Sequence, residues 1–341
     1  MSTRPEAPAT LNDVAKLAGV SLATASRVLN GSSRSVGADL ADSVRRAAVS
    51  LNYSPNGPAQ AMAKGHTTAI GMLAPDIADP FFTQVAAGAT AAAGHRQMML
   101  SLALHHGQPD REVAQIRAFR VQRARGLVIA GSRHRGEEGA ALVEAIGDLP
   151  AVLVGQPLAG LPAVGFDNVG AGRKLALQLA AIGYRQLVVL AGPRDHLTSA
   201  DRVAGLTRGA QESGLGLEVV VGAFTRTGGL QLVEGLLDED GLLARSDAAR
   251  LRELVVVATT DMMALGAMTA LHRSGRQPGA DVAVAGFNDL PILADVRPGL
   301  TTVRFPLRQA GELAVQHLLG AELPAALLAG EVVIRDSTPP R

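Results

Sequence analysis

Side chains suited to contact with another molecule are concentrated near the start of the chain, between Ser21 and Asn30. A helix beginning after Ser21 turns Ala25, Val28 and Leu29 inward, because a helix has 3.6 residues per turn. Its outward face then carries Leu22, Ala23, Ser26, Arg27 and Asn30. Hydroxyl, guanidinium and amide groups on one helix face can hydrogen-bond to base edges and phosphates in a DNA major groove. A helix with this outward face is one that can contact DNA.

A first helix and a tight turn precede this face. Thr10 is expected to cap a helix whose apolar residues recur at i, i+3, i+4 and i+7, namely Leu11, Val14, Ala15 and Ala18. Gly19 then supplies the turn, and Ser21 caps the second helix. In a helix–turn–helix, the second helix enters the major groove. Two amphipathic helices around a glycine also form an ordinary αα-hairpin, which is the commoner interpretation of these residues alone.

The residues that follow decide between the two interpretations. A third amphipathic helix is expected from roughly Asp39 to Leu51, with a buried side formed by Leu40, Val44, Ala47, Ala48 and Leu51. A turn-rich exit at 52–56 and a short run at 59–65 come next. The order resembles the headpiece of the LacI/GalR family of bacterial transcription regulators. That family's pattern D-V-A-x-x-A-G-V-S-x-x-T-x-S-R-V-L-N, then L-N-Y-x-P-N, is present at 13–30 and 51–56.

Composition sets the broad class of the protein. The 341 residues are 47% hydrophobic, which suits a small module plus a larger two-lobed body and excludes a disordered chain. Neither a membrane-length apolar run nor a signal-peptide pattern is present, so we expect a cytoplasmic protein. The absence of cysteine excludes disulfides and thiolate chemistry. The eight histidines are too scattered for a zinc site, and no metal or cofactor is expected.

The charge distribution is uneven although the net charge is only +1. Residues 1–65 carry seven basic and four acidic side chains, a net charge of +3, which leaves about −2 on the remaining residues. A basic head on a slightly acidic body is consistent with electrostatic affinity for DNA at one end only.

From Thr68 onward, apolar strands alternate with helices. Strands are expected at 69–74, 98–104, 126–130, 187–191, 254–258 and 281–286, with helices between them, such as 81–95 and 111–123. Continuous apolar strands predict α/β lobes whose parallel sheets are covered on both faces. Ligands of such sheets bind beyond the carboxyl ends of the strands. Those ends carry Asp76, Asp79–Phe82, Thr259–Asp261 and Phe287–Asp289, and one of Phe81 and Phe82 is expected in the cleft and the other in the core.

The body is similar to the same family's effector domain, which has the two-lobed fold of periplasmic sugar-binding proteins. The matching segments include G-x-x-x-P-D-x-x-x-P-F-F at 71–82, F-D-N at 166–168, R-x-x-G at 202–205, D-M-M-A-L-G-A-M at 261–268 and G-F-N-D at 286–289. The resemblance implies a chain that crosses between the lobes three times and an effector bound between them.

Seven effector-binding residues are expected, some from the resemblance and some from their places at strand ends and helix starts: Asp76, Phe81, Gln156, Arg202, Phe224, Thr260 and Asn288. The planar fork of Arg202 suits two sugar hydroxyls or a carboxylate, although a single arginine considered alone is more often a surface salt bridge. Asn288 stands where many relatives carry aspartate; its amide can bracket a diol or cap its own turn. Phe224 can stack on a sugar ring or pack in the core. Asp261, after Thr260, is expected to be a helix N-cap.

Ten DNA-binding residues are implied in the same way: Ser21, Leu22, Ala23, Thr24, Ser26, Arg27, Asn30, Tyr53, Asn56 and Met62. Leu22 and Ala23 occupy the family's main base-reading positions and offer only apolar contact, for example with thymine methyl groups. Specificity is therefore expected to depend on Arg27, Asn30 and DNA shape. In the hinge, Met62 stands where relatives wedge a leucine into the minor groove.

Three parts are expected: a helix–turn–helix headpiece at 1–54, a hinge helix and linker at 55–67, and a two-lobed effector-binding and dimerisation domain at 68–341. The expected function is a repressor whose affinity for operator DNA is controlled by a small sugar-like effector. A homodimer on a palindromic operator is expected, because no tetramerising helix follows the last expected strand. The sequence contains no nucleotide-binding or nucleophile motif that would support an enzyme. A sugar-binding protein without DNA function conflicts with the headpiece.

Overall fold

The computed structural model describes residues 9–30, 36–54, 66–131, 136–158 and 160–341. The chain divides into two compact units, Met1–Thr67 and Thr68–Arg341. Most of the expected hinge, including Asn56 and Met62, lies outside the described residues. In the described parts of the chain, no helix combines the length and apolar character needed to cross a bilayer.

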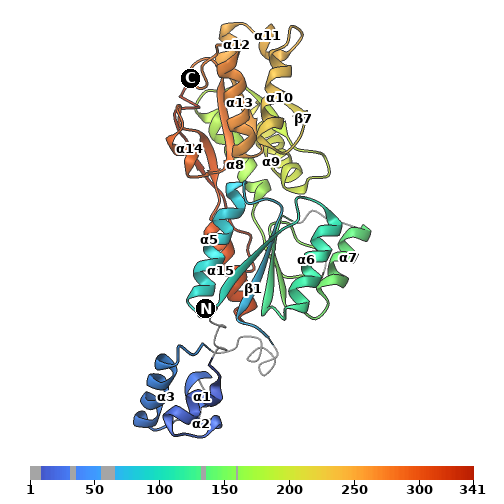
Figure 1. Ribbon diagram of the computed structural model, residues 1–341. Coiled ribbons are helices and arrows are strands. Elements are labelled where there is room, and N and C mark those ends of the chain that lie inside the picture. Colours follow the sequence, from blue (N-terminus) through green and yellow to red (C-terminus); the bar gives the residue numbers. More distant parts are fainter. Residues whose placement is uncertain (1–8, 31–35, 55–65, 132–135, 159) are drawn as a thin grey trace, which may run out of the picture. The chain divides into compact units, whose positions relative to one another are not determined.

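The smaller unit contains three helices, α1 (Leu11–Ala18), α2 (Leu22–Asn30) and α3 (Ala38–Ser50) (Figure 1). Thr10 caps α1 in a reciprocal arrangement: its side chain accepts from the backbone N–H of Asp13, and its own N–H donates to the Asp13 carboxylate at 3.0 Å. The bond from the Thr10 side chain holds the pKa of Asp13 below its ordinary value. Gly19 ends α1 with φ 67°, a left-handed conformation that glycine adopts without steric cost.

The core of this unit is formed by small and medium apolar side chains from all three helices, namely Val14, Ala15, Ala25, Val44, Ala47 and Ala48. One sequence expectation is wrong here: Leu40 is 49% exposed, and Ala41 is buried in its place. Ala41, Val44 and Ala48 follow the i, i+3, i+7 spacing of one helix face, and Leu40 precedes that face by about 100°.

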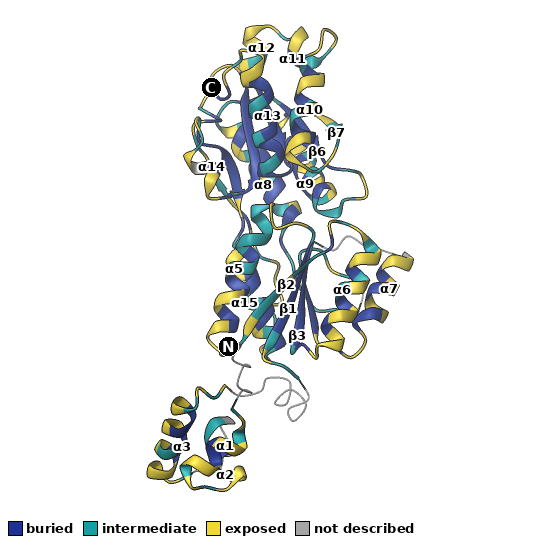
Figure 2. Ribbon diagram, viewed as in Figure 1, coloured by how far each residue is buried: buried dark blue, intermediate teal, exposed yellow. Residues whose placement is uncertain are grey.

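The first lobe of the larger unit is a five-stranded parallel sheet in the order β2-β1-β3-β4-β5. Helices α5 and α15 cover one face and α6 and α7 the other (Figure 1). The elements are β1 (Ala69–Ala74), α5 (Pro80–Gly94), β2 (Met99–Leu104), α6 (Pro109–Val121), β3 (Gly126–Ala130), α7 (Gly136–Ile146), β4 (Ala151–Val154), β5 (Ala163–Val164) and α15 (Leu307–Leu318). The central strands are almost wholly buried, which explains their continuous apolar sequences (Figure 2).

The second lobe is a six-stranded sheet in the order β11-β10-β9-β8-β6-β7, parallel except for β11. Helices α8 and α9 pair on one face, and α10 and α13 on the other. The elements are α8 (Asn168–Ala181), β6 (Gln186–Ala191), α9 (Leu197–Ser213), β7 (Gly216–Val221), α10 (Arg226–Leu237), α11 (Leu242–Arg245), α12 (Ala248–Arg252), β8 (Leu254–Ala258), α13 (Asp261–Arg273), β9 (Ala283–Asn288), α14 (Ile292–Asp295), β10 (Thr301–Arg304) and β11 (Glu331–Val333). The strand expected at 281–286 therefore begins and ends two residues later.

The chain passes between the lobes at three crossings. The first is 165–167, between β5 and α8; the second is 305–306, between β10 and α15; the third is 319–330, between α15 and β11. The first and third run side by side, since the Asp167 N–H donates to the Leu328 carbonyl and the Leu328 N–H to the Gly165 carbonyl, each at 2.9 Å. In each sheet, the strand that comes second in chain order (β2 or β7) lies at the edge, beside the strand that comes first (β1 or β6). The strand order therefore reverses direction at the first strand, and ligand crevices form at such switch points.

Candidate functional site

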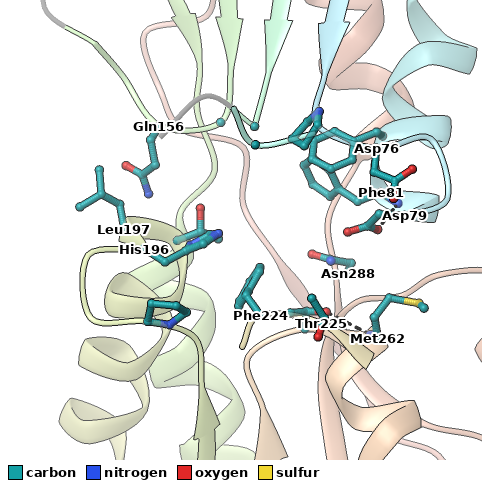
Figure 3. Close-up of a pocket in the computed structure, with 18 of the residues that line it drawn as sticks. Asp76, Asp79, Phe81, Gln156, His196, Leu197, Phe224, Thr225, Met262 and Asn288 are labelled. Atoms are coloured by element: carbon teal, nitrogen blue, oxygen red, sulfur yellow. Dashed lines mark hydrogen bonds between the residues drawn. The ribbon is translucent and has the colours of Figure 1, made fainter. Parts of the chain in front are cut away.

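A cavity of about 650 Å³ lies where the carboxyl ends of the two parallel sheets face each other (Figure 3). Its walls come from the segments that follow β1, β2, β3 and β4 in lobe 1 and β6, β7 and β8 in lobe 2, together with the end of β9. The volume is in the range of small-molecule binding sites. All seven expected effector-binding residues line it: Asp76, Phe81, Gln156, Arg202, Phe224, Thr260 and Asn288.

Several helices begin at this cavity, and their caps use part of its polar side chains. Asp79 caps α5 by accepting from the Phe81 N–H at 2.9 Å, and Thr260 caps α13 by accepting from the Met262 N–H at 3.0 Å. The expectation that Asp261 is the cap of α13 is therefore wrong. The Thr260 hydroxyl still has its own hydrogen to donate to a ligand.

Arg202 is 3% exposed and is held by neutral acceptors. Its Nε donates to Asn168 Oδ1 at 2.9 Å, Nη1 to the Thr259 carbonyl at 2.7 Å and Nη2 to Asn288 Oδ1 at 3.0 Å. The guanidinium also lies 4.9 Å from the ring centroid of Phe287. These bonds use three of the five N–H groups of the arginine. The interpretation of Arg202 as a surface salt bridge is excluded.

Three charged groups in and behind the wall have perturbed pKa values. Burial lowers the pKa of Arg202 to about 9, and at that pKa the guanidinium is still charged at neutral pH. Burial also raises the pKa of the half-buried Asp79. Behind the cavity, burial raises the pKa of Asp261 to about 6, although its carboxylate accepts from Thr302 Oγ1 at 2.6 Å and from the Leu290 N–H at 2.8 Å.

Aromatic rings form the apolar part of the wall. Phe224 stacks on His196, with ring centroids 4.0 Å apart and planes tilted by 32°. On the lobe 1 side both Phe81 and Phe82 line the cavity, edge to face at 5.1 Å, so the expectation that one of them lies in the core is wrong. Phe166 of the first crossing continues this edge-to-face series from Phe81. The wall of the cavity therefore combines flat apolar surfaces with hydrogen-bonding groups.

Sequence reasoning placed Asp79 at a strand end without counting it as an effector-binding residue, and it missed several other cavity residues, including His106, Asn168, His196 and Arg226. His106 lies two residues after the expected end of a strand at 104, and that position was the available signal for it. Asn168 was noted only within a matching motif. His196 and Arg226 lie at the starts of helices α9 and α10, and no residue pattern marks those starts as parts of one cavity.

The residues expected to contact DNA through a helix lie on α2 and at its start. Ser21 Oγ accepts from the Thr24 N–H at 3.2 Å and lies 2.9 Å from Thr24 Oγ1, which confirms the N-cap geometry. Leu22, Ala23 and Arg27 are exposed, and Ser26 is half-buried. Asn30 is the last residue of α2. The partly buried Tyr53 packs against the core of the three-helix unit.

Comparisons with known proteins agree with this architecture. Residues 10–56 match the bacterial regulatory proteins of the lacI family, and residues 67–328 match the periplasmic binding proteins and sugar binding domain of the LacI family. The HTH-type transcriptional regulator CelR of Thermobifida fusca is 29% identical, over 96% of this chain and 98% of its own.

Two solved structures extend the comparison. A crystal structure of the lac repressor dimer bound to operator and the anti-inducer ONPF has a TM-score of 0.84 at 27% identity, covering 98% of this chain and 100% of that one. A complex of the transcriptional regulator CelR with cellobiose has a TM-score of 0.67 at 27% identity, covering 96% and 99%.

The fold and the cavity define a two-lobed ligand-binding protein joined to a helix–turn–helix unit. The chain belongs to the LacI family of bacterial regulatory proteins. It is a DNA-binding transcriptional regulator with an effector-binding domain. Regulators of this family are not enzymes, and neither is this protein.

Proposed function

We propose that this regulator is a repressor whose affinity for a palindromic operator is controlled by a small sugar-like effector. The observation that supports this most directly is the cavity between the lobes, which joins stacked rings to converging hydrogen-bonding groups. Movement of the lobes around an effector changes the path of the chain at the three crossings. Because the DNA-binding unit joins lobe 1 at Thr68, such movement can alter affinity for DNA.

A sugar is the ligand class that fits the polar and apolar groups together. Asn288 and the remaining N–H groups of Arg202 can bind neighbouring hydroxyls, while Phe224 offers a surface for the apolar face of a ring. The solved complex of the transcriptional regulator CelR with cellobiose supports a carbohydrate effector.

A homodimer is the assembly we propose. One edge strand of each sheet, β2 or β7, exposes apolar side chains: Met99 is 70% exposed, Leu102 37%, Val219 37% and Val221 43%. Apolar edge strands of this kind need a cover, and a second copy of the chain supplies one by two-fold symmetry. The dimeric state of the lac repressor supports the same arrangement.

Selection of bound duplexes from a random pool by the purified full-length protein tests the proposal. It is run at one stated salt concentration, with and without D-glucose, D-galactose, D-ribose and cellobiose. We expect a palindrome to be enriched, and one sugar to lower the affinity for it. Enrichment of a palindrome only when a sugar is added would mean that the effector acts as a co-repressor. A palindrome that none of these sugars affects contradicts the sugar effector, and no enriched sequence contradicts the regulator as a whole.

A further inference from the structure

Asn288 places its amide in the cavity from a backbone conformation that side chains rarely adopt. Its φ angle is 122°, and the next residue, Asp289, has a φ angle of 54°. Non-glycine residues remain in such conformations only where the surroundings hold them there, and they are concentrated at ligand sites and switch regions. The interactions that hold residues 288 and 289 therefore determine how Asn288 meets Arg202 and a ligand.

Two arginines hold the residue after Asn288. The Asp289 carboxylate is 8% exposed; its Oδ1 accepts from Arg335 Nη2 and its Oδ2 from Arg304 Nε, each at 2.6 Å. Arg335 is itself fixed, because its Nη1 donates to the Leu300 carbonyl at 2.7 Å. Charge-assisted bonds of this length to a mostly buried carboxylate are among the stronger polar contacts in a protein.

One of the arginines ends the strand that leads into the second crossing, and the other follows the strand in which the third crossing ends. Arg304 is the last residue of β10, directly before the second crossing. Its Nη1 also lies 3.5 Å from Glu331, the first residue of β11, where the third crossing returns to lobe 2. Arg335 follows β11. Asp289 thus links the second and third crossings to the cavity residue Asn288.

We propose that Asp289 is a positioning residue that couples the geometry of the lobe crossings to the effector site. A rotation of the lobes turns the backbone at the second and third crossings and moves the Arg304 side chain. The ion pair transmits that movement to Asp289 and hence to Asn288 and its bond with Arg202. In the opposite direction, an effector that pulls on Asn288 acts on the crossings. This inference rests on the proposed effector control of operator binding.

Two substitutions separate coupling from support of the site. In Arg304→Gln, the bond from Arg335 continues to hold Asp289, so the cavity keeps its shape while the link to the second crossing is cut. In Asp289→Asn, both ion pairs are lost. Arg273→Gln is the matched control, because Arg273 makes an exposed ion pair with Glu234 at 3.5 Å in the same lobe, away from the crossings.

For each variant, two quantities are measured: the Kd for whichever of D-glucose, D-galactose, D-ribose or cellobiose the wild type binds, and the ratio of operator Kd values with and without that sugar. We expect Arg304→Gln to change the sugar Kd less than about threefold and to reduce the ratio roughly tenfold. Asp289→Asn should raise the sugar Kd and reduce the ratio, whereas Arg273→Gln should change neither quantity. A merely structural ion pair would lower the Tm and leave the ratio unchanged.

The outcomes distinguish this inference from the function on which it rests. The wild-type protein responds to the sugar if the function proposed above is correct. If Arg304→Gln and Asp289→Asn then show the same ratio of operator Kd values as the wild type, the coupling role of Asp289 is contradicted and the proposed function is not. A wild-type protein whose operator affinity no sugar changes contradicts the proposed function, and the coupling role falls with it.

Discussion

Gln156 of lobe 1 donates a hydrogen bond from Nε2 to Asp201 Oδ2 of lobe 2, across a distance of 2.7 Å beside the cavity. Gln156 belongs to the segment after β4 and Asp201 to helix α9, so this bond joins the two lobes directly. Because the acceptor is a carboxylate, the bond is stronger than one between neutral groups. It limits the separation that the lobes can reach without an effector.

Gln156→Ala should weaken sugar binding by roughly five- to tenfold, since the lobes must then be brought together at the expense of the effector's own contacts. Asp201→Asn is the control: its amide oxygen still accepts from Gln156, so the loss should be smaller. Isothermal titration with the sugar that the wild type binds measures both. An unchanged Kd in Gln156→Ala would mean that the bond does not constrain the lobes.

Arg202→Ala should destabilise the larger unit by about 3 kcal/mol, because three acceptors in a buried site lose their donor. It should also abolish the sugar response of operator binding, while the headpiece keeps its own separate core. Arg202→Lys should have a stability and a sugar response between those of the wild type and Arg202→Ala, since one ammonium group cannot reach three acceptors that lie in different directions.

Urea denaturation and operator binding with and without sugar measure these effects. Arg208→Ala on the same helix serves as control, because that side chain is 67% exposed and makes a surface ion pair with Glu212. A sugar response that survives in Arg202→Ala would show that the arginine supports the wall without contacting the effector.

The elements were predictable where the sequence carries a periodic signal. The buried strands β1, β3 and β8 have near-continuous apolar sequences, and the helices of the smaller unit follow caps and a glycine turn. Leu40 was placed wrongly because a phase error of one residue turns a helix face by about 100°.

The network around Asp289 could not be predicted in this way. Its arginine partners lie 15 and 46 residues further along the chain, and Arg335 is reached only after the chain has crossed to lobe 1 and returned. No local spacing connects such residues. The seven cavity residues expected from the sequence do meet in one cavity, whereas His196 became visible only when the carboxyl ends of both sheets were brought together.

Asp261 should make the stability of the larger unit depend on pH. Its pKa is about 6 in the folded protein, against 3.8 ordinarily, because burial disfavours the charged carboxylate. The folded state therefore holds this proton more tightly than the unfolded state. The resulting stabilisation is complete below about pH 3.8 and is lost as the pH rises through about 6. The difference between the two pKa values corresponds to about 3 kcal/mol.

Asp261→Asn removes this titration, and the asparagine side chain can still hydrogen-bond to the Thr302 hydroxyl and accept from the Leu290 N–H. We therefore expect the free energy of unfolding of the wild type to fall by up to about 3 kcal/mol relative to Asp261→Asn between pH 4 and pH 7. Urea denaturation across that range gives the two curves. Curves that run parallel would contradict the raised pKa.

Gly205 should be essential to the position of Arg202, because it lets helices α8 and α9 approach closely. A Cβ at Gly205 would lie 2.1 Å from the Val169 carbonyl oxygen, a distance that only separation of the two helices can relieve. Asn168, which accepts from Arg202, is the first residue of α8, so the same separation pulls acceptor and donor apart. We expect Gly205→Ala to destabilise the larger unit by about 2–3 kcal/mol and to abolish sugar binding.

Gly235→Ala on α10 is the matched control, since a Cβ there meets nothing within 4 Å. In that helix interior the substitution should stabilise the protein by about 0.5–1 kcal/mol, because alanine has less backbone freedom to lose on folding. The two variants thus carry the same chemical change and should shift the Tm in opposite directions. Equal shifts, or a Gly205→Ala protein that binds the sugar like the wild type, would mean that the close contact of α8 and α9 does not set the position of Arg202.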